Sequence, residues 1–165
     1  MFNIERILVP TDFSDFSDLA LERAVDLANS CGAIGAKIYL TYVWPEAPDV
    51  FKLSKYIVEG QKKIQAEMEK QCEKYFAEQI AKVPEAENVE IETKVFQGSP
   101  YRKILDFQKK IKADLVVIGT HGATPLEGFF FGSTSSKIIR HATCSVMIVR
   151  KPLYEYTPMS KGLHT

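Results

Sequence analysis

The chain has 165 residues, of which 45% are hydrophobic and 25% charged, and its 21 basic side chains balance its 21 acidic ones. This length fits one domain with a core of its own and is too short for two. A net charge of zero gives no field that would attract nucleic acid or an anionic membrane, so we expect neither as a partner. No apolar run reaches the ~20 residues of a membrane span, and Glu5 and Arg6 stand where a signal peptide would be apolar. We therefore expect a soluble, cytoplasmic protein.

The three cysteines, Cys31, Cys72 and Cys144, are far apart in the sequence and form no C-x-x-C pair. This spacing argues against a disulfide framework and against a zinc site. We expect them to be core thiols.

The first apolar run, residues 4–10, has the length and β-branched content of a buried parallel strand that ends at Pro10. A helix follows, for which Ser14 or Asp15 can cap the first turn and Gly32 can provide the end. The apolar residues that recur at helical spacing are Phe16, Ala20, Ala24, Leu27 and Ala28.

A second strand is predicted for residues 37–43, and the two prolines of the next six residues exclude regular structure there. From about residue 54 to residue 82 the sequence is charged and helical, and its charge run is interpreted as the solvated side. The predicted inner face consists of Ile57, Ile64, Met68, Cys72, Tyr75, Phe76 and Gln79.

Residues 88–98 alternate apolar and polar side chains, which predicts a strand with one wetter face and an edge position. Ser99 as cap and Pro100 as first helical residue then give a strong helix start. The helical repeat consists of Ile104, Phe107, Gln108 and Ile111.

Residues 114–119 form the most apolar strand, which we expect to be central. A helix over residues 133–141 and a last strand, Val146 to Arg150, follow. This alternation of strands and helices predicts an α/β fold: one parallel sheet covered by helices on both faces, with right-handed crossovers. We assign residues 1–150 to this domain and residues 151–165, which show no periodicity, to a C-terminal extension.

In an open parallel sheet, ligands bind beyond the carboxyl ends of the strands, and glycines and hydroxyl side chains gather there in this sequence. Glycines can take backbone angles closed to other residues, and they let main-chain amides approach a bulky anion closely. The helix that begins at Ser133 adds unpaired amides and a favourable dipole. Walker and Rossmann patterns are absent, yet this segment suits a phosphate chain.

The glycines and the hydroxyl residue, Gly119, Gly122, Gly132 and Ser133, form the pattern G-x2-G-x9-G-S. This is the pattern of the ATP-binding branch of the universal stress protein family, which the chain resembles over roughly residues 1–150. The stretches RILVPTDFSDFSDLALERAVDLA, VFQGSP and HATCSVMIV are similar to further blocks of that family.

The resemblance implies a Rossmann-like sheet of five strands in the order 3-2-1-4-5, with ATP between the first and fourth strands and a Mg²⁺ or Mn²⁺ ion on its phosphates. It also implies a homodimer paired through Val146–Arg150. Asp12 would contact the nucleoside. The other implied contacts are Pro10, Thr11 and Val43 for the adenine, Ile118, Gly119, Thr120, His121 and Gly122 for the ribose and first phosphates, and Gly132, Ser133 and Thr134 for the distal phosphates.

Two departures from the family pattern bear on these expectations. Residues 123–131 contain Glu127 and no Lys or Arg, so phosphate charge must be met by amides, the helix terminus and a metal, which lowers the expected affinity. Ser145 stands where the family usually has proline before its last strand, which restores a main-chain donor there.

Other interpretations remain beside these. The glycines also fit a flexible loop, Asp12 a turn before a helix, and Phe129–Phe131 a patch over the core or a partner. His121 has no nucleophile and orienting carboxylate that the sequence can assign to it, so we expect a main-chain role and no catalytic residue.

We thus expect a nucleotide-dependent stress sensor or regulator with slow ATP hydrolysis or none, acting on a protein partner that the sequence does not identify. The alternative is a dimerisation or interaction module whose pocket is empty or takes AMP. A receiver domain is disfavoured, because KVFQG offers no aspartate at the end of the third strand.

Overall fold

The computed structural model describes residues 3–30, 35–44, 55–120 and 132–150. The predictions for Gly32 and Cys31 and for the extension 151–165 lie outside these residues. The elements in chain order are β1 (Arg6–Thr11), α1 (Asp15–Ser30), β2 (Lys37–Trp44), α2 (Lys55–Ala81), the 3-10 helix η2 (Pro84–Asn88), β3 (Glu90–Gln97), α3 (Pro100–Ile111), β4 (Leu115–Gly119), α4 (Ser133–His141) and β5 (Ser145–Val149).

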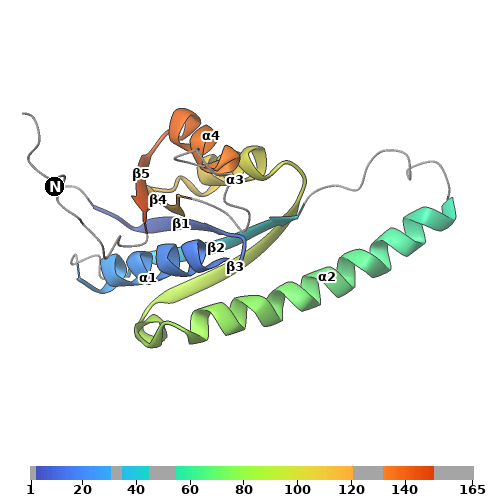
Figure 1. Ribbon diagram of the computed structural model, residues 1–165, viewed down its shortest axis with the longest axis horizontal. Coiled ribbons are helices and arrows are strands. Elements are labelled where there is room, and N and C mark those ends of the chain that lie inside the picture. Colours follow the sequence, from blue (N-terminus) through green and yellow to red (C-terminus); the bar gives the residue numbers. More distant parts are fainter. Residues whose placement is uncertain (1–2, 31–34, 45–54, 121–131, 151–165) are drawn as a thin grey trace, which may run out of the picture.

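The strands form one parallel sheet in the order β3-β2-β1-β4-β5, which confirms the predicted topology. Figure 1 shows α1 and α2 on one side of this sheet and α3 and α4 on the other. The prediction that residues 114–119 lie at the centre needs a correction. β4 is an interior strand and is buried throughout, but β1 holds the central position.

Alternation along the strands divides the core into two layers. Ile7 and Val9 of β1 belong to the core cluster beneath α1 and α2. Leu8 belongs to the second cluster, beneath α3 and α4, together with Ile104 and Ile138. Because β1 and β4 are buried on both faces, their sequences read as continuous apolar runs.

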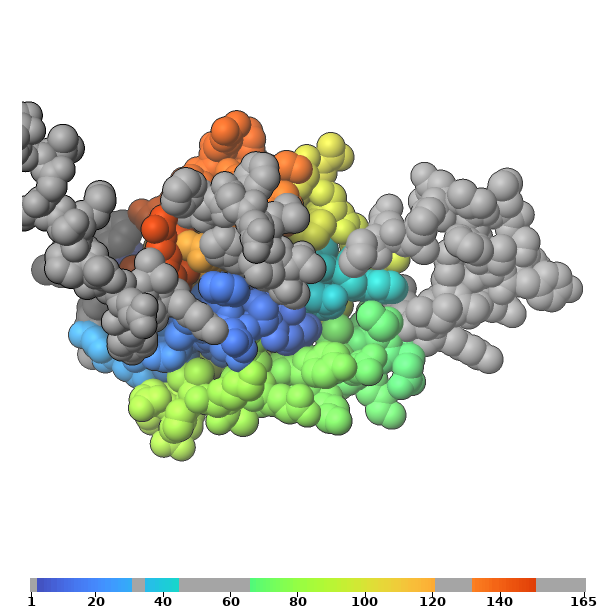
Figure 2. All heavy atoms as spheres, in the orientation of Figure 1, coloured from blue at the N-terminus to red at the C-terminus, as the bar shows by residue number. Residues whose placement is uncertain are grey.

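The long helix α2 lies against α1 through its C-terminal half, as Figure 2 shows in green and blue. Cys72, Phe76 and Gln79 of this half are buried, as predicted, whereas Tyr75 is 42% exposed. The N-terminal half of α2 extends past the sheet (Figure 1). Among the α2 side chains that the structure describes, those of the C-terminal half contact the core.

Two local predictions were incomplete. Ser99 is the N-cap residue of α3 and Pro100 follows it, but the Ser99 hydroxyl makes no capping hydrogen bond. The 3-10 helix Pro84–Asn88 was not predicted, because a single turn is too short to show a periodicity. β3 lies at one edge of the sheet, as expected, and β5 lies at the other.

Candidate functional site

The carboxyl ends of β1 and β4 lie side by side, because these strands pair in parallel. We call the side of the sheet where the strands end its carboxyl edge. Gly119, the last residue of β4, packs against the first turn of α1. A Cβ atom built on Gly119 would lie 2.8 Å from the main-chain oxygen of Phe16. Any side chain at residue 119 would therefore collide with main chain, and the turn after β1 and the end of β4 form one continuous surface.

The connection from β4 to α4 begins and ends at the same place. The Thr120 amide donates to the Val149 carbonyl over 3.1 Å, and the Gly132 amide donates to the Thr120 carbonyl over 2.9 Å. The Ser135 hydroxyl donates to the Gly119 carbonyl over 3.0 Å and is buried. These bonds bring both described ends of the glycine motif together, while His121 and Gly122 lie outside the described residues.

The amino end of α4 points its first amides toward this edge. Gly132 is the N-cap residue and has no side chain with which to cap them, while Ser133 is exposed and Thr134 half-buried. Uncapped amides and the helix dipole favour an anion at such a position. Within the described residues, no N-cap side chain is bonded to this helix start, where the sequence predicted phosphate contacts.

Of the two physical reasons given for the glycines, the one based on backbone angles closed to other residues was wrong at the two described positions. Neither Gly119 nor Gly132 has a positive φ, and Gly132 is extended, with φ −62° and ψ 159°. Gly119 is needed for close packing against α1, and Gly132 leaves the helix start open. Backbone freedom explains neither.

The turn from β1 to α1 is fixed by side-chain hydrogen bonds. Asp12 is half-buried, and its Oδ1 accepts from the Ser14 amide at 3.1 Å and from the Ser14 hydroxyl at 2.5 Å. Between them, Phe13 adopts a left-handed conformation with φ 61°. A left-handed backbone is uncommon for a bulky residue and is typical of functional sites and tight turns.

Phe13 is held in this conformation by an aromatic cluster. Its ring centroid lies 4.9 Å from that of Tyr42, 5.4 Å from Tyr75 and 5.3 Å from Phe76. Burial raises the pKa of Tyr42, and Cys72 and Asp12 nearby raise it further. Asp12 therefore lies next to a cluster of aromatic side chains.

The Thr11 side chain lies on the side of the sheet that α1 and α2 cover. It is 7% exposed, and its hydroxyl lies 3.0 Å from Oε1 of Gln79 and 2.9 Å from Oγ of Ser17, beneath α1 and α2. Val43 and Ile118, in contrast, belong to the core layer under α3 and α4. Val43 and Ile118 thus lie on one face of the sheet, and the Thr11 side chain lies on the other.

Basic side chains that the sequence did not assign to the site occur on α3 and α4. Lys103 lies across Gly98, since a Cβ there would meet its Cε at 2.8 Å. Lys137 of α4 stacks over the Tyr101 ring, with Nζ 4.3 Å from the centroid. Arg102 Nε donates to the Tyr101 hydroxyl over 2.9 Å and thereby lowers the pKa of Tyr101. Only the packing of α3 on α4 brings these cations together.

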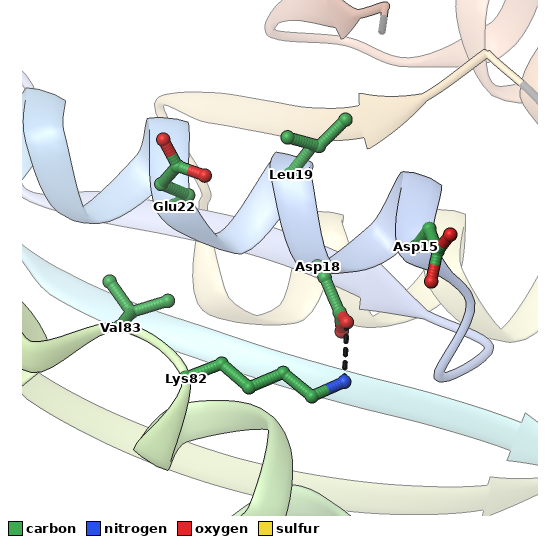
Figure 3. A pocket seen from close by; sticks show the side chains of 6 residues that line it. All are labelled: Asp15, Asp18, Leu19, Glu22, Lys82 and Val83. Carbon is green, nitrogen blue, oxygen red and sulfur yellow. Dashed lines mark hydrogen bonds and ion pairs between the residues drawn. The ribbon is translucent and has the colours of Figure 1, made fainter.

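A pocket of about 210 Å³ lies elsewhere, between α1 and the end of α2 (Figure 3). Its ion pair joins Lys82 Nζ to Asp18 Oδ2 at 2.6 Å. None of the predicted site residues lines it, so we do not assign the ligand to it. Its lining residues are Asp15, Asp18, Leu19, Glu22, Lys82 and Val83.

The described part of the chain contains no group of three or more His, Cys, Asp or Glu residues that could hold a metal ion. The thiol of Cys72 is buried and that of Cys144 half-buried, which agrees with core positions for both. Among the described helices, none combines the length and the apolar character needed to cross a membrane.

Comparison with known sequences decides the family. The sequence profile described as "Universal stress protein family" matches residues 3–150. The chain belongs to the universal stress protein family. It is 34% identical over 151 residues to the universal stress protein MJ0531 of Methanocaldococcus jannaschii, covering 92% of this chain and 85% of that protein. It is 31% identical to the universal stress protein YxiE of Bacillus subtilis, covering 91% of this chain and 100% of that protein.

Solved structures show the same fold. The hypothetical protein MJ0577 superposes with a TM-score of 0.68 at 22% identity and covers 90% of this chain and 96% of its own. A universal stress protein in complex with cAMP has a TM-score of 0.59 at 23% identity, covering 90% and 98%. The universal stress protein from Archaeoglobus fulgidus in complex with dAMP has a TM-score of 0.54 at 20% identity, covering 90% and 98%.

Proposed function

We propose that this universal stress protein binds ATP at the carboxyl edge of β1 and β4 and acts as a nucleotide-dependent regulator of the stress response in the cytoplasm. The observation that carries the proposal is the start of α4, where the N-cap residue Gly132 makes no side-chain cap. There the hydrogen bond from Gly132 to Thr120 sets uncapped helix amides beside the turn that contains Asp12. A nucleotide suits both features, because its phosphates can bind the helix amides while its nucleoside contacts Asp12.

The proposed contacts follow the motif. Asp12 contacts the nucleoside, Pro10 and Val43 line the adenine, and Thr11 contributes its main chain because its hydroxyl is bonded to neighbours. The ribose and first phosphates meet Ile118, Gly119, Thr120, His121 and Gly122, and the distal phosphates meet Gly132, Ser133 and Thr134.

The two nucleotide complexes among the solved structures support an adenine ligand. One neighbour is in complex with cAMP and another with dAMP, so an adenine base with a sugar and a single phosphate is common to both ligands. The step from a monophosphate to ATP depends on the α4 start, which offers amides and hydroxyls for further phosphates. An AMP-binding interaction module is the alternative, and these monophosphate complexes are the observation that favours it.

We propose that a Mg²⁺ or Mn²⁺ ion enters with the phosphates, where it would neutralise part of their charge. The donors at the α4 start suit the anion and not the cation, because main-chain amides and hydroxyl hydrogens bind phosphate oxygen. Arg102, Lys103 and Lys137 lie on the bordering helices and add positive charge to the region. Residues 123–131 contain no Lys or Arg that could compensate the charge that develops during hydrolysis, so we propose slow hydrolysis or none.

We further propose a homodimer through residues 146–150. β5 lies at the edge of the sheet, and an edge strand exposes main-chain donors and acceptors that a second copy can pair with. Light scattering after size exclusion measures this directly, and a monomer at micromolar concentration contradicts it.

To test the nucleotide site, we replace Gly132, the N-cap residue of α4, with a residue whose side chain can cap the helix. Gly132→Asp places a carboxylate at the start of α4, where it caps the amides and repels phosphate. We expect calorimetry to show ATP binding at least about tenfold weaker than in the wild type, with AMP binding much less affected. The matched control is Ser99→Asp, which puts the same charge at the N-cap of α3. Equal ATP affinity in both variants and the wild type contradicts the phosphate assignment, and AMP binding without added affinity for ATP favours the alternative.

A further inference from the structure

A buried glutamine on α2 connects that helix to the turn that carries Asp12. Gln79 is 2% exposed and lies 67 residues beyond Asp12 in the sequence. Its Nε2 donates to Asp18 Oδ1 over 2.8 Å. A carboxylate only accepts, so this bond fixes the amide orientation and directs Oε1 toward the Thr11 hydroxyl, 3.0 Å away.

The Thr11 hydroxyl has two acceptors within reach, Ser17 Oγ at 2.9 Å and Gln79 Oε1 at 3.0 Å, and donation to Gln79 leaves an acceptor for every hydrogen of the network. The Thr11 hydroxyl donates to Gln79 and accepts from the Phe13 amide over 2.9 Å. The second Nε2 hydrogen of Gln79 is directed at Ser17 Oγ, 3.4 Å away. The Ser17 hydroxyl then donates to the Ser14 carbonyl over 2.8 Å. Every donor in this arrangement has an acceptor.

Both branches from Gln79 lead to Asp12. One passes through Thr11 to the amide of Phe13, the residue next to Asp12. The other passes through Ser17 to Ser14, whose amide and hydroxyl both donate to Asp12 Oδ1. The Phe13 ring is also held by Tyr75 and Phe76 of α2, so polar and aromatic contacts tie the same turn to the same helix.

We propose that Gln79 is a positioning residue for the nucleotide site: it holds the β1–α1 turn, and with it the Asp12 carboxylate, in the geometry that receives the nucleoside. The inference rests on the proposed function. It adds that nucleotide affinity depends on the contacts of α2 with the β1–α1 turn, although α2 contributes no residue to the predicted site. A buried hydrogen-bond network of this kind favours a single turn conformation.

A matched control exists in the same chain. Gln108 of α3 is also 2% exposed, and its side chain is bonded to the Thr143 hydroxyl and amide. These residues lie where α3 ends and just before β5 begins, at the amino ends of the strands, whereas Asp12 lies at the carboxyl ends. Gln108→Met therefore removes an equally buried glutamine without touching the candidate site, whereas Gln79→Met removes the connection to the turn.

The experiment has two readouts on isotope-labelled full-length protein. Without nucleotide, amide hydrogen exchange at Phe13 and Ser14 should be about tenfold faster in Gln79→Met than in the wild type and unchanged in Gln108→Met. With ATP and magnesium, calorimetry should give about tenfold weaker binding for Gln79→Met and a change within about twofold for Gln108→Met. Should Gln79→Met not fold, Thr11→Val breaks the same connection at its other end.

The outcomes separate this inference from the proposed function. Unchanged exchange at Phe13 and Ser14 in Gln79→Met overturns the inference whether or not ATP binds, as do equal losses of affinity in the two glutamine variants. A wild-type protein that binds no adenine nucleotide overturns the proposed function, while the exchange result still decides whether Gln79 holds the turn. If Gln79 acts through Thr11, the double variant Thr11→Val with Gln79→Met loses no more affinity than Thr11→Val alone.

Discussion

The two segments that border the candidate site are built in different ways. The turn after β1 is short and contains no glycine, and it is held by side chains: Asp12 on Ser14, Thr11 on Gln79, and Phe13 among aromatic rings. The connection after β4 is long, and its described ends are held by main-chain bonds between Thr120, Gly132 and Val149. Two neighbouring segments of the candidate site are thus held in place by different kinds of contact.

The largest expected effect separates two glycines of the same motif. Gly119→Val should destabilise the protein by about 3 kcal/mol, because its side chain would press on the Phe16 main chain in a closely packed core. Gly132→Ala should stay within about 0.5 kcal/mol, because φ −62° suits any residue. Urea unfolding measures both. Equal costs at the two positions would contradict the distinct roles assigned to them.

The next effect concerns the strained residue of the first turn. Phe13→Ala should cost about 2 to 3 kcal/mol in lost aromatic packing. Phe13→Gly should be about 1 kcal/mol more stable than Phe13→Ala, because glycine accepts φ 61° without the Cβ penalty. Thermal unfolding of the two variants tests this order, and an alanine variant that is the more stable shows that the left-handed turn is not retained.

A smaller effect compares two buried threonines. Thr41 is 1% exposed, and its Oγ1 has no hydrogen-bond partner among the described residues. Thr41→Val should therefore stabilise the protein by about 1 kcal/mol, since it removes an unsatisfied polar atom without changing the shape. Thr11→Val should destabilise it by about 1 kcal/mol, because the Thr11 hydroxyl is bonded on both sides. Changes of the same sign in both variants refute the assignment of these partners.

The smallest effect lies away from the site, on the exposed charges of β2 and β3. Lys37 and Lys94 each approach Glu92 to 2.7 Å, and their hydrogen bonds lower the pKa of Glu92 from 4.5 to about 2. A carboxyl group whose pKa is lower in the folded state stabilises that state at a pH above its unfolded pKa. This contribution should therefore disappear as the pH falls from 4.5 to about 2. Glu92→Gln should flatten this part of the acid unfolding curve, and about 1 M salt should hide the difference. An unchanged curve at low salt would show that the pair contributes nothing.

The sequence predicted the parallel sheet and most helix positions because periodicity and apolar runs are local signals, whereas the strand order followed from the resemblance to the universal stress protein family. It also assigned phosphate contacts to the segment after β4, since glycine spacing can be read within fifteen residues, and this assignment stays a prediction. It missed the support of the first turn, because Gln79 and Tyr75 come from a helix more than sixty residues away and only packing unites them with Thr11 and Phe13. The side chain of Thr11 shows this limit clearly: its position at the strand end was predicted, and its direction was not.

The most direct measurement of the central claim is an NMR titration of the isotope-labelled protein with ATP and magnesium. The account predicts saturable shifts at the amides of Asp12, Val43, Gly119, Gly132 and Ser133, at the carboxyl edge of the sheet. Amides of the opposite edge, at Gln108 and Thr143, should stay in place. No saturable shift at millimolar ATP, or shifts confined to the opposite edge or to the pocket around Asp18 and Lys82, would contradict the account.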